Sequence, residues 1–257
     1  MNARRLGSRV HGAFIRRVSR WLGRRPVALR PTRPLISFTF DDFPRSALLT
    51  GGAILEQHAL HGTYYVAMGL VNQTIATGDI FWRNDLDDLL SRSHELGCHT
   101  FDHSPAWESP PDAYESSVIR NVAALSALKQ SICPQTHSYP ISYPRPSTKR
   151  RLSRLFRACR FGGQTSNRGV VDLNALSSFF IEQSVHDFGA IERVIADNAA
   201  RAGWLIFSTH DVTAAPTRYG CTPDSFDRIV RRARDSGAAI LTMSEALDEL
   251  GVPNIGL

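Results

Sequence analysis

The chain has 257 residues, enough for one large α/β domain or two small ones, and 42% of them are apolar while 21% are charged. This balance is typical of a folded globular protein and excludes a disordered chain. The formal charge of +6 is concentrated at one end, because residues 1–33 contain ten arginines and no acidic residue. The sequence therefore divides into a basic arm at 1–33 and a slightly acidic domain at 34–257.

The basic arm contains a predicted amphipathic helix. Residues 8–24 place Val10, Phe14, Val18, Trp21 and Leu22 at helical spacing, with the arginines mostly off that stripe. Such a helix can lie on an anionic membrane surface; a poorly ordered terminus, or a helix docked on the domain, is the alternative. Nucleic-acid binding is not expected, because no recognition motif accompanies the charge.

Cysteine usage and hydropathy indicate the compartment. The four cysteines are widely spaced and form no C-x-x-C pair, so no disulfide framework is predicted. Arginines interrupt the apolar core that a secretory signal needs, and no stretch is apolar enough to span a bilayer. We therefore expect a cytoplasmic protein. Through its basic arm, this protein could also bind peripherally to the inner face of the membrane.

Strand-like and helix-like segments alternate from Leu35 onward. The predicted strands are Ile36–Phe40, Thr63–Met68, Thr136–Ser142, Phe161–Ser166, Trp204–Thr209 and Ala238–Thr242. The predicted helices are Ser46–Leu60, Asn84–Leu96 with Gly97 as its stop, Asp112–Lys129, Ser147–Cys159, Phe188–Ala202, Pro223–Asp235 and Ser244–Leu250. The alternation predicts an α/β fold with a mainly parallel sheet or barrel, of about seven βα units.

Polar side chains gather where the strands of this fold would end. Asp41 and Asp42 end the first strand, His99 and His103 follow a short apolar step, and His210 ends Trp204–Thr209. Because parallel α/β folds collect their active sites at the carboxyl ends of strands, these residues are expected to converge on one mouth.

The two histidines stand in H-T-F-D-H, a spacing of four that puts both imidazoles on one face if the segment is helical. Two neutral imidazoles and a carboxylate make a three-ligand divalent site with open positions. The histidines favour zinc, and manganese, cobalt and nickel stay open.

Three motifs together identify a family. F-T-F-D-D at 38–42, H-T-F-D-H at 99–103 and S-T-H at 208–210 resemble the polysaccharide deacetylases of the NodB homology group, carbohydrate esterase family 4. The resemblance, which extends to chitooligosaccharide deacetylases, implies a distorted, incomplete (β/α)7-type barrel. It also implies metal-dependent removal of acetyl groups from N-acetylglucosamine-type oligo- or polysaccharides.

The resemblance also implies roles for single residues. Asp41 matches the general base, and His210 matches the late histidine that acts as general acid. Asp42, His99 and His103 match the metal ligands.

The chain departs from the family at S-Y-P-R-P, residues 142–146, because Ser142 stands where the base-orienting arginine is expected. Arg145 is a candidate to supply that guanidinium from nearby. Tyr143 and Trp107 are candidates to line the sugar groove with Arg145, since aromatic faces suit a pyranose. No clear match exists for the later Asp motif that tunes the histidine, although Asp172 and Asp187 are candidates.

A run of basic residues follows this segment and is predicted to form a solvated helical face, or else to contact an anionic saccharide carrier. Its members are Lys149–Arg151, Arg154, Arg157 and Arg160.

Three alternatives to the oligosaccharide deacetylase stay open. The same chemistry could act on a lipid-linked sugar, which the arm favours, or on the O-acetyl groups of a polysaccharide. A third alternative is an inactive carbohydrate-binding relative, suggested by the missing arginine.

Overall fold

Seven parallel strands close into a barrel in the computed structural model, which describes residues 12, 14–129 and 132–255. Each strand pairs with the next, and pairing of the last strand with the first completes the ring. In ring order the strands are β2 (Leu35–Phe40), β3 (Thr63–Val66), β6 (Glu95–Cys98), β7 (Thr136–Ser138), β8 (Ala158–Gly162), β10 (Leu176–Phe180) and β11 (Trp204–Thr209). The expected incomplete (β/α)7-type barrel is confirmed.

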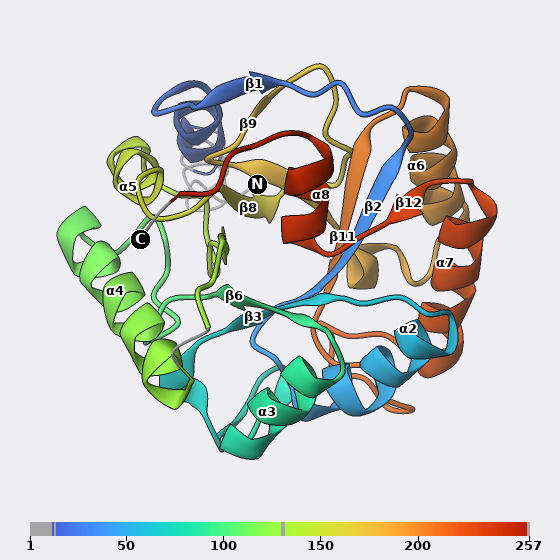
Figure 1. Cartoon of the computed structure of the whole chain (residues 1–257), viewed down its shortest axis with the longest axis horizontal. Helices are drawn as coiled ribbons and strands as arrows, with labels where there is room; N and C mark the ends of the chain where they lie inside the picture. The colour runs from blue at the N-terminus through green and yellow to red at the C-terminus, as the bar shows by residue number, and fades with distance from the viewer. Residues whose placement is uncertain (1–11, 13, 130–131, 256–257) are drawn as a thin grey trace, which may run out of the picture.

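Helices surround this barrel (Figure 1). The α-helices are α2 (Ala53–Gln57), α3 (Arg83–Ser91), α4 (Pro111–Leu128), α5 (Pro146–Leu152), α6 (Phe188–Ala200), α7 (Pro223–Asp235) and α8 (Met243–Glu249). Helical turns of other types are η1 (Ala47–Gly52), η2 (Met68–Leu70) and η3 (Ile181–Ser184). The remaining strands are β1 (Pro26–Ala28), β4 (Thr74–Ile75), β5 (Gly78–Asp79), β9 (Val170–Asp172) and β12 (Ala239–Ile240).

The sequence of β2 explains both faces of the barrel wall. Ile36, Phe38 and Phe40 point outward into the core beneath the helices. Ser37 and Thr39 point inward, and their hydroxyls are hydrogen-bonded to β11 at 3.0 and 2.7 Å. Polar groups can therefore line the barrel interior without loss of hydrogen bonds.

One end of the barrel is closed by α8, whose Met243, Ala246 and Leu247 pack against Leu35 and Trp204 at the strand starts. In Figure 1 this helix lies across the barrel. The wall is distorted at the same end, because β12 pairs with the first two residues of β2 while β3 pairs with its last two. The other end of the barrel, where the strands finish, is open, and the candidate functional residues lie there.

The predicted helix Asn84–Leu96 is wrong in its second half. The helix α3 ends at Ser91, and Glu95–Cys98 is the barrel strand β6. Gly97 is therefore no helix stop: a Cβ there would lie 2.5 Å from the ring of Tyr65 on the neighbouring strand β3. The glycine lets the Tyr65 ring fill the barrel interior.

The predicted helix Ser147–Cys159 is also too long. It ends at Leu152, and the next strand occupies Ala158–Gly162 rather than Phe161–Ser166. The predicted strand Thr136–Ser142 ends at Ser138, and the strands β9 and β10 were not predicted. These strands have only three to five residues, and β8 and β10 carry an arginine or serines between apolar residues, so their period-two pattern is weak.

The described part of the basic arm packs against the domain. A helix over residues 14–21 leads into β1, which pairs with β9. Lys149 of α5 donates hydrogen bonds to the carbonyls of Ser19 and Leu22, at 2.7 and 3.0 Å. Val10, the first residue of the predicted stripe, lies outside the described residues. The division into an arm at 1–33 and a domain at 34–257 stays a prediction.

No described helix combines the length and the apolar composition that crossing a membrane requires. Three of the cysteines are buried and all four are free thiols; Cys133 is the exposed one.

Candidate metal centre and active site

Asp42, His99 and His103 come together at the open end of the barrel. One ligand atom of each lies within 4.8 Å of the others. Oδ1 of Asp42 is 3.4 Å from Nε2 of His99 and 3.0 Å from Nε2 of His103. The same Oδ1 is buried and has no hydrogen-bond partner. A buried carboxylate oxygen facing two imidazole nitrogens fits a divalent cation, so these residues would hold the metal.

Loops after two strands position these ligands. Asp42 follows β2, and the two histidines follow β6. Asp42, Thr100 and His103 have left-handed backbone, with φ of 61°, 60° and 50°. The segment H-T-F-D-H is therefore not helical, and an irregular, bent backbone brings the two imidazoles together instead. Non-glycine residues in this region are costly and cluster at functional sites.

Electrostatics also favour a cation between the three side chains. Burial alone would raise the pKa of Asp42, but the imidazoles of His103 and His99 that face its carboxylate hold that pKa well below its usual range. Burial alone would lower the pKa of His103, and the Asp42 carboxylate raises it. His99 donates from Nδ1 to the carbonyl of Ser138 at 2.8 Å, which leaves Nε2 to face the site.

Thr77 supports the metal carboxylate. Its hydroxyl, in the turn between β4 and β5, donates to Oδ2 of Asp42 at 3.0 Å. That hydrogen bond engages Oδ2, so Oδ1 is the oxygen that faces the two histidines. Thr77 was not singled out from the sequence, because the turn lies 35 residues from Asp42 along the chain.

Thr77→Val is expected to weaken metal affinity by roughly 10- to 100-fold, the usual effect of losing an outer partner of a metal ligand. Thr77→Ser keeps the hydroxyl and should bind metal as the wild type does. Competition with a chromophoric chelator measures both affinities. Equal affinity of the Val variant and the wild type would contradict this role for Thr77.

Arg160 holds the predicted base. Its guanidinium donates to both oxygens of Asp41, at 2.6 and 3.2 Å, and its side chain is fully buried. Ser208 of β11 adds a third hydrogen bond at 3.3 Å. Burial is the largest single effect and raises the pKa of Asp41, but Arg160, together with His99 and His210, brings that pKa below its usual value. The base is thus ionised.

The candidate Arg145 does not perform this task. Its guanidinium donates to the backbone carbonyls of Trp107 and Glu108 instead. The arginine expected at Ser142 is replaced by one on β8, which reaches Asp41 through the barrel interior. An arginine inside a short apolar strand is the signal that could have located it.

The predicted solvated basic face is consequently only half correct. Lys149, Arg157 and Arg160 are buried. Lys149 pairs with Asp172 at 2.6 Å and Arg157 with Asp248 at 2.7 Å. The other three members, Arg150, Arg151 and Arg154, are exposed. Asp172 therefore stabilises the contact between the arm and the domain, through Lys149 and the backbone N–H of Arg25, and is not the partner of His210.

His210 follows β11 and is half-buried at the same mouth as Asp41. Its Nδ1 lies 3.1 Å from the carbonyl oxygen of Tyr219. Because a carbonyl can only accept, Nδ1 carries the hydrogen and Nε2 is left for chemistry. Asp187, the other candidate partner, caps α6 instead.

Trp107, Tyr143 and Arg145 form a half-buried group beside the mouth. Arg145 lies 5.9 Å from the centre of the Trp107 ring, and Tyr143 packs edge-on against Phe161 at 4.9 Å. Ser142 accepts a hydrogen bond from the backbone N–H of Trp107 at 2.9 Å. Their roles in substrate binding stay predictions.

Glu182 is a half-buried acid that was not singled out from the sequence. It lies in η3, directly after β10, the strand between those of Arg160 and His210. Oε2 is buried and has no hydrogen-bond partner. Burial raises the pKa of Glu182 to about 8, and the nearby Asp41 charge adds to the effect.

Glu182→Gln is expected to stabilise the protein at pH 8.5 by a few kcal/mol and to change little at pH 4.5. The folded-state pKa is raised, so folding of the wild type is favoured at low pH and weakens as pH rises from 4.5 toward 8. The amide has no proton to lose in this range. Thermal or urea unfolding of both proteins across that pH range measures the difference; a pH-independent difference would contradict this assignment.

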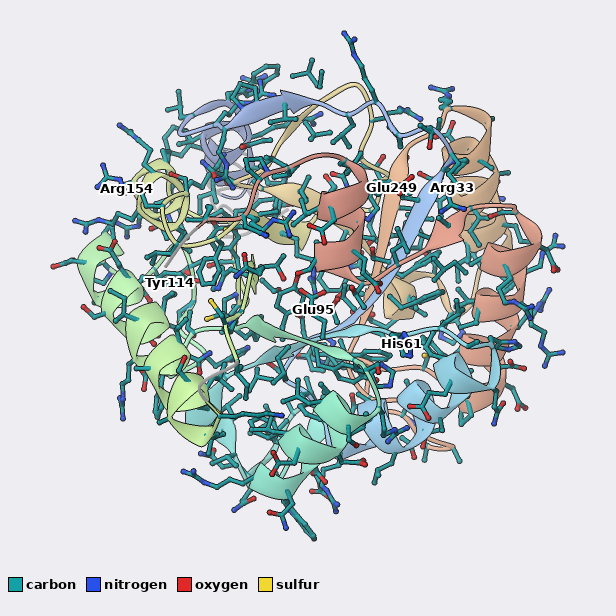
Figure 2. All side chains as sticks on the ribbon, viewed as in Figure 1. Arg33, His61, Glu95, Tyr114, Arg154 and Glu249 are labelled. Atoms are coloured by element: carbon teal, nitrogen blue, oxygen red, sulfur yellow. The ribbon has the colours of Figure 1, made fainter. Side chains whose placement is uncertain are left out.

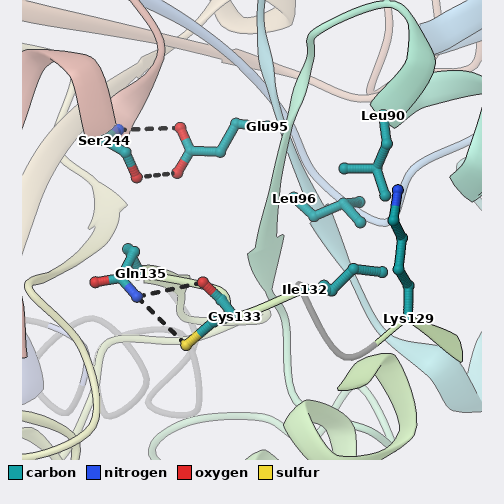
Figure 3. A pocket seen from close by; sticks show the side chains of 8 residues that line it. All are labelled: Leu90, Glu95, Leu96, Lys129, Ile132, Cys133, Gln135 and Ser244. Carbon is teal, nitrogen blue, oxygen red and sulfur yellow. Dashed lines mark hydrogen bonds between the residues drawn. The ribbon is translucent and has the colours of Figure 1, made fainter. Parts of the chain in front are cut away.

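A separate hollow lies at the opposite end of the barrel (Figure 3). Glu95 and Leu96 at the start of β6 line it with Ser244 of α8. Glu95 accepts hydrogen bonds from the N–H and hydroxyl of Ser244 at 3.0 and 2.6 Å. Burial raises the pKa of Glu95, but its partners are complete, so it anchors α8 to the barrel.

The family model for polysaccharide deacetylases matches residues 28–156, just over half of the chain and including all three metal-site residues. The chain belongs to the polysaccharide deacetylase family. No curated protein matches it.

Several solved structures share the fold. A family 4 acetyl xylan esterase from Clostridium thermocellum, in complex with cobalt, is 22% identical with a TM-score of 0.59, covering 85% of this chain and 93% of its own. The Bc1960 peptidoglycan N-acetylglucosamine deacetylase is 14% identical with a TM-score of 0.61, covering 88% and 92%.

A pseudoenzyme of the same family is also similar. The Bacillus anthracis protein BA3943 is 12% identical with a TM-score of 0.59, covering 86% of this chain and 67% of its own. A mutant of that protein has restored enzymatic activity. The fold alone therefore does not establish activity, and the site residues must be argued one by one.

Proposed function

We propose that this polysaccharide deacetylase is an active, metal-dependent hydrolase that removes acetyl groups from N-acetylglucosamine-type oligo- or polysaccharides. The observation that carries the proposal is the complete centre: three converging metal ligands beside an aspartate that two hydrogen bonds from Arg160 keep ionised. An inactive binding protein has no need of a buried, charge-paired base.

The metal that Asp42, His99 and His103 would hold, with zinc favoured, supplies a Lewis acid that polarises the acetyl carbonyl. Asp41 accepts the proton of the attacking water, for which its ionised state is required. His210 presents Nε2 to the mouth, since Nδ1 is engaged by Tyr219. In its protonated form it donates to the departing sugar nitrogen as the carbon–nitrogen bond breaks, which yields acetate and a free amine.

Acetate release from defined substrates tests the proposal. Acetylated chitooligosaccharides, peptidoglycan fragments and O-acetylated xylan are compared with purified protein loaded with zinc, cobalt, manganese or nickel. We expect release from the N-acetylated sugars, loss after chelation and recovery on metal addition. Release from xylan alone would replace the proposal by the O-acetyl esterase.

Asp41→Asn is the matched control, because it keeps the shape of the base and removes its ability to take a proton. It should bind metal and release no acetate. A wild-type protein that binds sugar and metal but releases no acetate from any substrate would establish the inactive relative instead.

A further inference from the structure

The helix over residues 14–21 docks on the domain by a different face from the apolar stripe seen in its sequence. Ile15 and Ser19 are the buried residues of this helix. Phe14 and Trp21 keep 58% and 62% of their surface exposed, and Leu22 is exposed as well. The contacts with the domain therefore leave the aromatic stripe uncovered.

Exposed arginines lie beside this aromatic stripe. Arg17 and Arg20 of the helix are exposed, and so is Arg24, whose guanidinium lies 5.7 Å from the ring of Trp21. Successive residues on a helix differ by 100°, so Arg17 and Arg20 lie on one side of the Phe14–Trp21 line.

The neighbouring helix α5 extends the charge. It adjoins the arm through the Lys149 hydrogen bonds and through Arg25, which donates to the carbonyl of Ser153 at 3.0 Å. Arg150 of α5 and Arg154, two residues beyond its end, are exposed, and Figure 2 shows Arg154 beside this helix. Among the described residues, no carboxylate lies within 4.0 Å of either guanidinium, whereas Arg151 pairs with Glu115.

We propose that these residues form a surface that docks on anionic lipid membranes. This arm surface consists of Phe14, Arg17, Arg20, Trp21, Leu22 and Arg24, with Arg150 of α5 and Arg154 just beyond it. Exposed aromatic and leucine side chains enter the region between headgroups and acyl chains, while arginines contact the phosphates. Basic residues alone would suit nucleic acid equally; the uncovered apolar stripe beside them favours lipid.

The arm surface would hold the deacetylase against the membrane without a spanning segment. None of its residues is a predicted metal ligand, base or acid, so the docking proposal is independent of the proposed catalytic activity. Vesicle binding and acetate release can therefore fail separately.

Vesicle co-sedimentation of the full chain tests this proposal. Vesicles of phosphatidylcholine alone are compared with vesicles containing a third phosphatidylglycerol. We expect binding to the anionic vesicles only, weakened by salt. The triple variant Arg17→Gln/Arg20→Gln/Arg24→Gln should lose roughly a hundredfold in affinity, since each arginine near the headgroups contributes about fivefold. Arg193→Gln/Arg201→Gln/Arg231→Gln removes the same charge from exposed positions of α6, its C-terminal end and α7, and should bind as the wild type does.

Tryptophan fluorescence reports the geometry of binding. Trp21 should shift to the blue on anionic vesicles and be quenched by brominated acyl chains. Trp21→Phe should keep the affinity and lose most of the shift. Equal losses in the two triple variants, absence of vesicle binding, binding to duplex DNA at physiological salt instead, or self-association through this face without lipid binding would each overturn the proposal.

Discussion

Asp42→Ala is expected to abolish metal binding and to lower the rate of acetate release by about 10³-fold or more. Asp42 contributes the negative charge of the centre, and its Oδ1 is the atom that both histidines face. Without it, two neutral imidazoles remain, which is fewer than the three protein ligands typical of a catalytic zinc site. Metal content of the dialysed protein and initial rates of acetate release measure the two effects.

Asp102→Ala is the matched control, because it removes the same charge from the middle of the H-T-F-D-H segment. Asp102 points away from the ligands: it accepts a hydrogen bond from Ser117 at 2.9 Å and is exposed. We expect metal content near the wild-type level. An Asp42→Ala protein that retains both metal and wild-type turnover would remove Asp42 from the ligand set.

Arg160→Met is expected to destabilise the protein by about 3–5 kcal/mol, because it leaves the buried Asp41 carboxylate without its partner. Activity should fall with it, since burial alone raises the pKa of Asp41 and favours a protonated acid that cannot act as base. Urea unfolding measures the first effect, and acetate release measures the second.

The pH dependence of this variant has a definite sign. In the wild type the pKa of Asp41 is depressed, so its stabilising contribution is present at neutral pH and is lost as pH falls through that lowered pKa. In Arg160→Met the pKa of Asp41 is raised, and the unpaired charge costs most at neutral pH. The stability difference between the two proteins should therefore narrow as pH is lowered toward about 4.

Two further variants separate the ion pair from a general packing effect. Asp41→Asn/Arg160→Met removes both charges and should recover most of the lost stability while remaining inactive. Arg154→Met removes an exposed arginine from the same stretch and should change neither property. A double variant as unstable as Arg160→Met would show that the arginine acts through packing instead.

The strongest local patterns were the parts of the fold that the sequence predicted well. Trp204–Thr209 and Pro223–Asp235 match the structure at both ends. A continuous apolar run marks the first, and a proline-started amphipathic pattern marks the second. The errors fall on Glu95–Cys98 and Ala158–Gly162, where few apolar residues stand beside a glycine or an arginine. The glycine and the arginine are present because they fit the barrel interior. Tertiary packing, not local strand propensity, therefore accounts for these two strands.

The sequence by itself predicted Asp42, His99 and His103 as metal ligands and, through the family resemblance, Asp41 as the base, because all four residues stand in short motifs that can be read locally. It could not determine that Arg160 holds the base, since that contact joins strands 119 residues apart across the barrel. Nor could it determine that Thr77 supports Asp42 or that the Phe14–Trp21 stripe faces outward. Each of these three features depends on which side chains point inward in the closed barrel and in the docked helix. Only the packing of the whole chain decides that orientation.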